Sequence, residues 1–121
     1  MQRLLATSCL LVATSGASAQ WSDDPAVNLA VSDGSTSPAV THCAADGDGG
    51  TWIAWYDASA GYDVMLQHLD ATGESSFADP VIVDDQVNTW VQDFELAVDT
   101  FGRAVVAWPG DTSIEVACVL L

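Results

Sequence analysis

Apolar and polar residues alternate with a two-residue period in several short segments of this chain. In residues 50–56, Thr51, Ile53 and Trp55 share one face, because successive side chains of a β-strand point to opposite sides. Strand-like segments of this kind occur at residues 38–45, 50–56, 63–70, 79–84, 91–98, 103–109 and 113–121. The pattern predicts an all-β protein made of short antiparallel strands.

The strand pattern occurs twice. Residues 44–55 align without a gap on residues 97–108, at an offset of 53 residues, and match at Ala, Asp, Gly, Ala and Trp. The apolar face is kept in both copies, with Trp108 at the place of Trp55, so we predict that both tryptophans lie in the core. Residues 63–69 also align on 115–121 after one deletion.

These alignments divide the chain into three parts and predict two consecutive four-stranded antiparallel meanders. Residues 79–84 supply the last strand of the first meander, and the second meander is incomplete. The predicted parts are a signal peptide at 1–19, a first β repeat at 20–76 and a second, incomplete β repeat at 77–121.

The links between the strands have the composition of tight turns. Asp at the first position can accept hydrogen bonds from amides ahead of it, and Gly at the fourth position tolerates a positive φ. Three predicted turns have this pattern: Asp46 with Gly49, Asp70 with Gly73, and Asp99 with Gly102.

One segment also fits an amphipathic helix. Its apolar residues with helical spacing are Val87, Trp90, Val91, Phe94 and Val98. We favour a strand, because the equivalent segment of the first repeat begins at Pro38, which suits a strand start and not a helix interior.

Repeated four-stranded meanders of this length are typical of β-propeller blades. Residues 46–70, with "TWIAWYD" and "GYDVMLQHLD", resemble repeats of large secreted bacterial β-propellers that are loosely related to sialidase-like propellers. The Asp box of sialidases would read Ser-x-Asp-x-Gly-x-Thr-Trp. Here residues 48–52 are one residue short and lack the leading serine, so that motif is absent.

The resemblance implies a partial β-propeller, because a ring takes four to eight blades. We therefore expect the chain to be a fragment of a longer protein, with assembly from several chains as the alternative. The second repeat reaches residue 121 inside a strand, and we expect self-association through open sheet edges.

The first residues predict the compartment. Arg3, the apolar stretch 4–12 and the Ala-Ser-Ala sequence at 17–19 are typical of a secretory signal peptide that is cleaved before Gln20. The apolar stretch is about half the roughly 20 residues that a membrane span needs. The sequence thus predicts a secreted or periplasmic protein.

The chain is strongly acidic, with a net charge of −15. Arg103 would be the only Lys or Arg left against 17 carboxylates after removal of residues 1–19. A surface of this sign repels phosphate backbones and anionic lipid headgroups, so we expect neither nucleic acid nor membrane as a partner. The ligand stays unidentified, with carbohydrate and protein as the candidates.

No metal site or cofactor is predicted. Asp46 and Asp48 could begin a calcium loop, but the remaining oxygen ligands are missing, and a plain turn explains the same residues. His42 and His68 are too few for zinc, lie on non-neighbouring strands, and are interpreted as isolated surface or half-buried histidines without a nucleophile partner.

Cys43 and Cys118 form an even number of cysteines in an oxidising compartment, which permits one disulfide. Both lie in apolar strand segments. We favour free cysteines that behave as small buried hydrophobic residues.

The function predicted from sequence is a non-enzymatic, secreted repeat module. One arginine cannot form the arginine cluster with which sialidases bind a carboxylate, and no Gly-x-Ser-x-Gly motif occurs. The alternative is a fragment of an extracellular glycan-acting hydrolase whose active site lies outside this chain. For three further tryptophans the sequence does not decide between packing in the core and stacking on a sugar: Trp21, Trp52 and Trp90.

Overall fold

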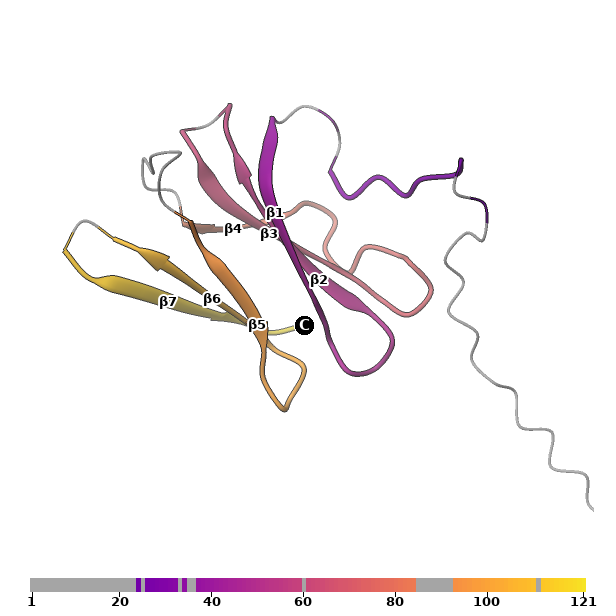
Figure 1. The fold of residues 1–121 in the computed structure, drawn as a ribbon. Helices are drawn as coiled ribbons and strands as arrows, with labels where there is room; N and C mark the ends of the chain where they lie inside the picture. The colour runs from indigo at the N-terminus through magenta and orange to yellow at the C-terminus, as the bar shows by residue number, and fades with distance from the viewer. Residues whose placement is uncertain are drawn as a thin grey trace, which may run out of the picture.

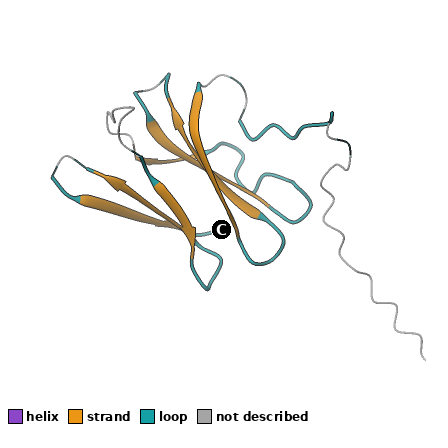
Figure 2. Ribbon diagram, in the orientation of Figure 1, coloured by secondary structure: helices purple, strands orange, loops and turns teal. Residues whose placement is uncertain are grey.

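The computed structural model describes residues 24, 26–32, 34, 37–59, 61–84, 93–110 and 112–121, and these residues form strands and turns without a helix. The strands are β1 (Pro38–Ala45), β2 (Thr51–Asp57), β3 (Asp63–Leu69), β4 (Val81–Asp84), β5 (Glu95–Val98), β6 (Ala104–Pro109) and β7 (Ile114–Val119). They make two antiparallel sheets, β1-β2-β3-β4 and β5-β6-β7 (Figures 1 and 2). The prediction of an all-β chain with two consecutive meanders is confirmed.

The first sheet, called sheet 1 below, includes β4, which pairs antiparallel with β3. β4 therefore belongs to sheet 1 although it follows residue 77 in the chain. The second sheet, sheet 2, begins at β5, directly after the buried Phe94. Residues 85–92, which carry most of the alternative helical pattern, lie outside the described residues, and 95–98 form a strand.

The three predicted Asp turns are confirmed and share one hydrogen-bonding pattern. In each turn one carboxylate oxygen accepts from the backbone amides two and four residues ahead, and the glycine has a positive φ of 78° to 95°. The donors are Asp48 and Gly50 for Asp46, Thr72 and Glu74 for Asp70, and Phe101 and Arg103 for Asp99. Side-chain acceptors thus satisfy amides that the hairpin leaves unpaired.

The hydrophobic core lies between the two sheets. Sheet 1 contributes Trp52, Ala54, Tyr56, Val64 and Leu66, and sheet 2 contributes Ala104, Val106 and Trp108, with Phe94 between them. We call these the inner faces of the sheets. Trp108 is in this core, as predicted. Trp55 is also buried, as predicted, but on the opposite face of β2, so the face of β2 that packs between the sheets is the one with Trp52.

The alignment of residues 44–55 on residues 97–108 explains this difference. The residues of sheet 1 equivalent to Ala104, Val106 and Trp108 are on the outer face of β2, where Ile53 and Trp55 lie. The two sheets therefore stack in the same orientation, so that the inner face of sheet 2 corresponds to the outer face of sheet 1. Both faces of β2 and of β6 carry apolar residues, and periodicity alone cannot tell which face a neighbour covers.

Contacts at one edge hold the stack together. The sheets approach most closely at β1 and β5, where the rings of His42 and Phe94 are 4.7 Å apart. The indole Nε1 of Trp52 donates to the carbonyl oxygen of Gly102 at 2.9 Å. This bond joins β2 to the β5–β6 turn and satisfies a donor that would otherwise be buried without a partner.

Candidate functional site

Two regions of the described chain bring chemically useful side chains together. One is a hydrogen-bonded cluster of Asp46, His68 and Ser76, and the other is a pocket on the outer face of sheet 1 around Trp55. Among the described residues no group of three potential metal ligands occurs.

The Asp46–His68–Ser76 cluster joins three segments. His68 Nε2 lies 2.9 Å from Asp46 Oδ2, and His68 Nδ1 lies 2.7 Å from Ser76 Oγ. The His68 side chain is 2% exposed and packs against Trp52 with the rings tilted by 57° and their centroids 4.7 Å apart. The interpretation of His68 as an isolated surface or half-buried residue was wrong, because the turn and the 70–76 loop converge on β3.

Asp46 is the electrostatic centre of this cluster. Its burial opposes ionisation, but the amide hydrogen bonds of Asp48 and Gly50 and the bond to His68 together keep the pKa of Asp46 below its ordinary value. Gly50 is required beside it, since a Cβ there would come within 2.5 Å of Asp46 Oδ2 and of the Leu69 carbonyl oxygen. Both oxygens of Asp46 are engaged, which supports the turn and disfavours a calcium loop.

In sheet 2 the second carboxylate oxygen of the turn aspartate, Asp99, binds an arginine and not a histidine. Arg103 stands where the first repeat has Gly50, and its Nε donates to Asp99 Oδ2 at 2.6 Å. The hydrogen bond from the Arg103 side chain is the main cause that holds the pKa of Asp99 below its ordinary value. The single arginine among the described residues is thus bound to an aspartate of its own turn.

The remaining predicted polar candidates lie apart from one another. His42 is half-buried, as predicted, and its Nε2 lies 3.3 Å from Asp93 Oδ1. Cys43 and Cys118 are free and exposed, so the prediction of free thiols holds, but their interpretation as buried residues was wrong. Each cysteine lies on the outer face of its sheet, which periodicity within a two-faced repeat could not reveal.

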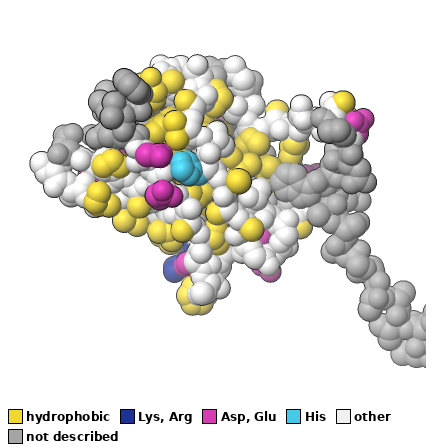
Figure 3. Space-filling model, viewed as in Figure 1, with side chains coloured by type: hydrophobic (Ala, Val, Ile, Leu, Met, Phe, Trp, Pro, Cys, Tyr) yellow, Lys and Arg dark blue, Asp and Glu magenta, His cyan; other side chains and the backbone are white. Residues whose placement is uncertain are grey.

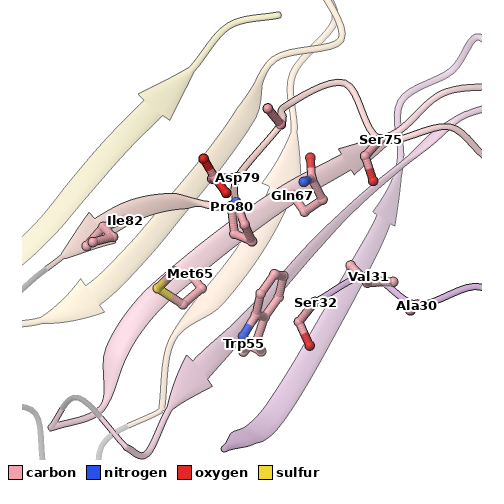
Figure 4. A pocket seen from close by; sticks show the side chains of 11 residues that line it. Ala30, Val31, Ser32, Trp55, Met65, Gln67, Ser75, Asp79, Pro80 and Ile82 are labelled. Carbon is pink, nitrogen blue, oxygen red and sulfur yellow. The ribbon is translucent and has the colours of Figure 1, made fainter. Parts of the chain in front are cut away.

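The pocket on the outer face of sheet 1 has a volume of about 480 Å³. Figure 4 shows Met65, Trp55 and Ser32 along one side and Asp79, Gln67 and Ser75 along the other. Trp55 and Met65 come from neighbouring strands and are directly paired in the β2–β3 register. Residues 30–32 and 78–80 complete the walls.

The lining is mainly apolar with a few polar groups. Gln67 is fixed by bonds to the Phe77 backbone, with its Nε2 donating to the carbonyl oxygen at 2.9 Å. Asp79 is exposed at the pocket. Trp55 is 3% exposed, and its Nε1 has no hydrogen-bond partner. This combination of apolar walls and fixed polar groups is typical of small-molecule sites.

Of the remaining sequence predictions, the one on Trp52 concerns a described residue, and the others do not. Trp52 is fully buried in the core, whereas Trp21, Trp90 and the predicted signal peptide at 1–19 lie outside the described residues. The Asp46–His68–Ser76 cluster was missed because Ser76 carries no motif. Its one sequence signal is Gly50, a residue without a side chain next to a turn aspartate.

Within the described residues no helix is long and apolar enough to cross a membrane. The comparisons with known proteins found no relative of this chain. No protein-family model matches the sequence, and neither the curated proteins nor the solved structures searched contain a match.

Proposed function

We propose that this chain is a secreted, non-enzymatic repeat module of the β-propeller type that binds a ligand on the outer face of sheet 1. The observation that carries the propeller interpretation is the stacking of two equivalent sheets in the same orientation. A two-layer sandwich buries one face of each sheet, whereas propeller blades bury both faces against successive neighbours. The signal-peptide pattern at 1–19 supports export.

The pocket around Trp55 supports binding of a carbohydrate that is uncharged or carries amino groups. Its walls offer a carboxylate and serine hydroxyls beside an indole and a thioether, while the amide of Gln67 is already bonded to the backbone. Polar groups of this kind can pair with hydroxyl groups of a sugar, while the apolar walls contact its ring carbons. The net charge of −15 disfavours anionic polysaccharides.

Isothermal titration calorimetry with neutral and amine-bearing oligosaccharides tests this proposal. We expect binding that weakens at least tenfold in Ala78→Trp, which fills the pocket, and weakens for amine-bearing sugars in Asp79→Asn. Asp48→Ala removes an equal charge outside the pocket and serves as the control. Absence of binding to every probe, or unchanged binding in Ala78→Trp, would contradict the proposal.

The hydrogen-bonded chain Ser76–His68–Asp46 favours a second candidate, a serine hydrolase. The backbone amide of Ser76 already donates to the His68 carbonyl oxygen at 2.8 Å, so it is not free to stabilise an oxyanion. A fluorophosphonate probe separates the two candidates. We expect no labelling of Ser76, and labelling that is lost in both Ser76→Ala and His68→Ala would establish the hydrolase instead.

A further inference from the structure

The outer face of sheet 2 is apolar and uncovered. Ile114 is 71% exposed and Val116 is 62% exposed, and Figure 3 shows hydrophobic side chains over this part of the molecule. The β5–β6 and β6–β7 registers place the following residues on this face: Val105, Ala107, Pro109, Ile114, Val116 and Cys118. A continuous apolar surface of this kind is typical of an interface.

The aligned residues of sheet 1 show how this face is arranged when another sheet covers it. Val116 corresponds to Val64, and Cys118 corresponds to Leu66, both of which are 0% exposed in sheet 1. In sheet 1 this face is covered by the inner face of sheet 2, which carries Val106 and Trp108. A matching cover for sheet 2 is therefore a sheet with equivalents of these two residues.

The chain itself carries such a sheet. Ile53 and Trp55, the equivalents of Val106 and Trp108, lie on the outer face of sheet 1. We propose that the outer face of sheet 2 binds the outer face of sheet 1 of a second copy of this chain, continuing the stack within each chain. The contact is heterologous, since each copy offers two different faces, and it can therefore extend to rings or filaments.

Two features of the surface set the conditions for this contact. Within the described strands of sheet 2, Glu95 is the only charged residue on the outer face, so the contact itself is almost free of charge. The whole chain carries −15, so two copies repel each other at low salt. Residues 30–32 line the pocket beside Trp55, so the second sheet and a ligand in that pocket compete for the same face of sheet 1.

Analytical ultracentrifugation of the exported chain tests the interface. We expect an average mass at least twice that of the monomer, which rises with protein concentration and with NaCl. Val116→Glu places a charge at the centre of the outer face and should leave a folded monomer. Phe101→Glu is the matched control, because Phe101 is 81% exposed in the β5–β6 turn, and it should assemble like the unmodified chain.

Mixing two variants tests whether the sheet that covers the outer face of sheet 2 belongs to a second copy of this chain. Ile53→Glu blocks the partner face and should also be monomeric, and Ile82→Glu, 56% exposed on the same face, replaces it should Ile53→Glu fail to fold. An equimolar mixture of Val116→Glu with the blocked sheet 1 variant retains one intact pair of faces. We expect a dimer that does not grow further.

Three results would overturn the proposal. They are a monomeric unmodified chain at high salt and high concentration, assembly of Val116→Glu equal to that of the control, and a mixture that stays monomeric. The first would mean that another protein or another segment covers this face. The last would indicate contact between identical faces or through sheet edges.

Discussion

Sheets 1 and 2 contain segments that align in sequence, yet the aligned residues differ greatly in exposure. Val64 and Leu66 of sheet 1 are fully buried, while their equivalents in sheet 2, Val116 and Cys118, are exposed. All four residues are apolar and lie on the corresponding face of their sheets. The comparison shows that burial in a stacked repeat depends on the neighbouring sheet, because each unit can cover only one face of the next.

The Asp turns of the two sheets also differ, in the partner of the second carboxylate oxygen. Asp46 and Asp99 accept the same two amide hydrogen bonds, but the second oxygen binds buried His68 in sheet 1 and Arg103 in sheet 2. A partner from another strand ties the first turn to the sheet, whereas Arg103 remains 41% exposed within its own turn. Sheet 1 is thus more tightly connected than sheet 2.

The largest expected effect distinguishes the two faces of β2. Trp52→Ala removes a fully buried indole and its bond to Gly102, and we expect a loss of about 3–5 kcal/mol in the free energy of unfolding. Trp55→Ala removes an indole that has no hydrogen-bond partner and borders a pocket into which neighbouring side chains can relax, so its loss should be smaller. Urea denaturation of both variants measures the difference, and equal losses would contradict the assignment of inner and outer faces.

The next effect concerns the tie between the first turn and sheet 1. Asp46→Ala leaves buried His68 without its Nε2 partner and also removes the acceptor for two amides. We expect a loss of about 2–3 kcal/mol in the free energy of unfolding. Asp48→Ala lies in the same turn on an exposed residue and should change it by less than about 0.5 kcal/mol. A similar loss in both variants would show that the cluster does not stabilise the fold.

The environments of Trp52 and Asp46 also show which features of the fold could be predicted from the sequence. Period-two alternation and the Asp-Gly spacing predicted the strands and all three turns, because both signals are local. The core face of β2 and the environment of His68 depend on which sheet or loop packs against the strand, and that information is distant in sequence. Trp52 looked ambiguous for the same reason, although its burial and its bond to Gly102 make it central to the stack.

A smaller effect follows from protonation of Asp46. Its folded-state pKa is below the ordinary value, so ionisation stabilises the fold above the unfolded pKa of about 3.9, and this contribution is lost as the pH falls through the folded pKa. The stability difference between the unmodified chain and Asp46→Asn should therefore shrink from about pH 5 downward. Urea midpoints from about pH 6 to pH 3 measure it. A difference that grows in acid would mean that Asp46 is protonated in the folded protein.

The smallest expected effect uses the two thiols as reporters of the outer faces. Cys43 and Cys118 are both free and exposed, so in a dilute, low-salt solution both should react with a thiol reagent without denaturation. Cys118 lies beside Val105 on the outer face of sheet 2. Its rate should fall severalfold as concentration and NaCl rise in the unmodified chain, because an assembled neighbour covers it, and should stay constant in Val116→Glu. Mass spectrometry of the labelled peptides follows each thiol separately. An equal slowing of Cys118 in the charged variant would show that salt acts on the thiol directly, and then sheet 2 would lack the cover that sheet 1 has.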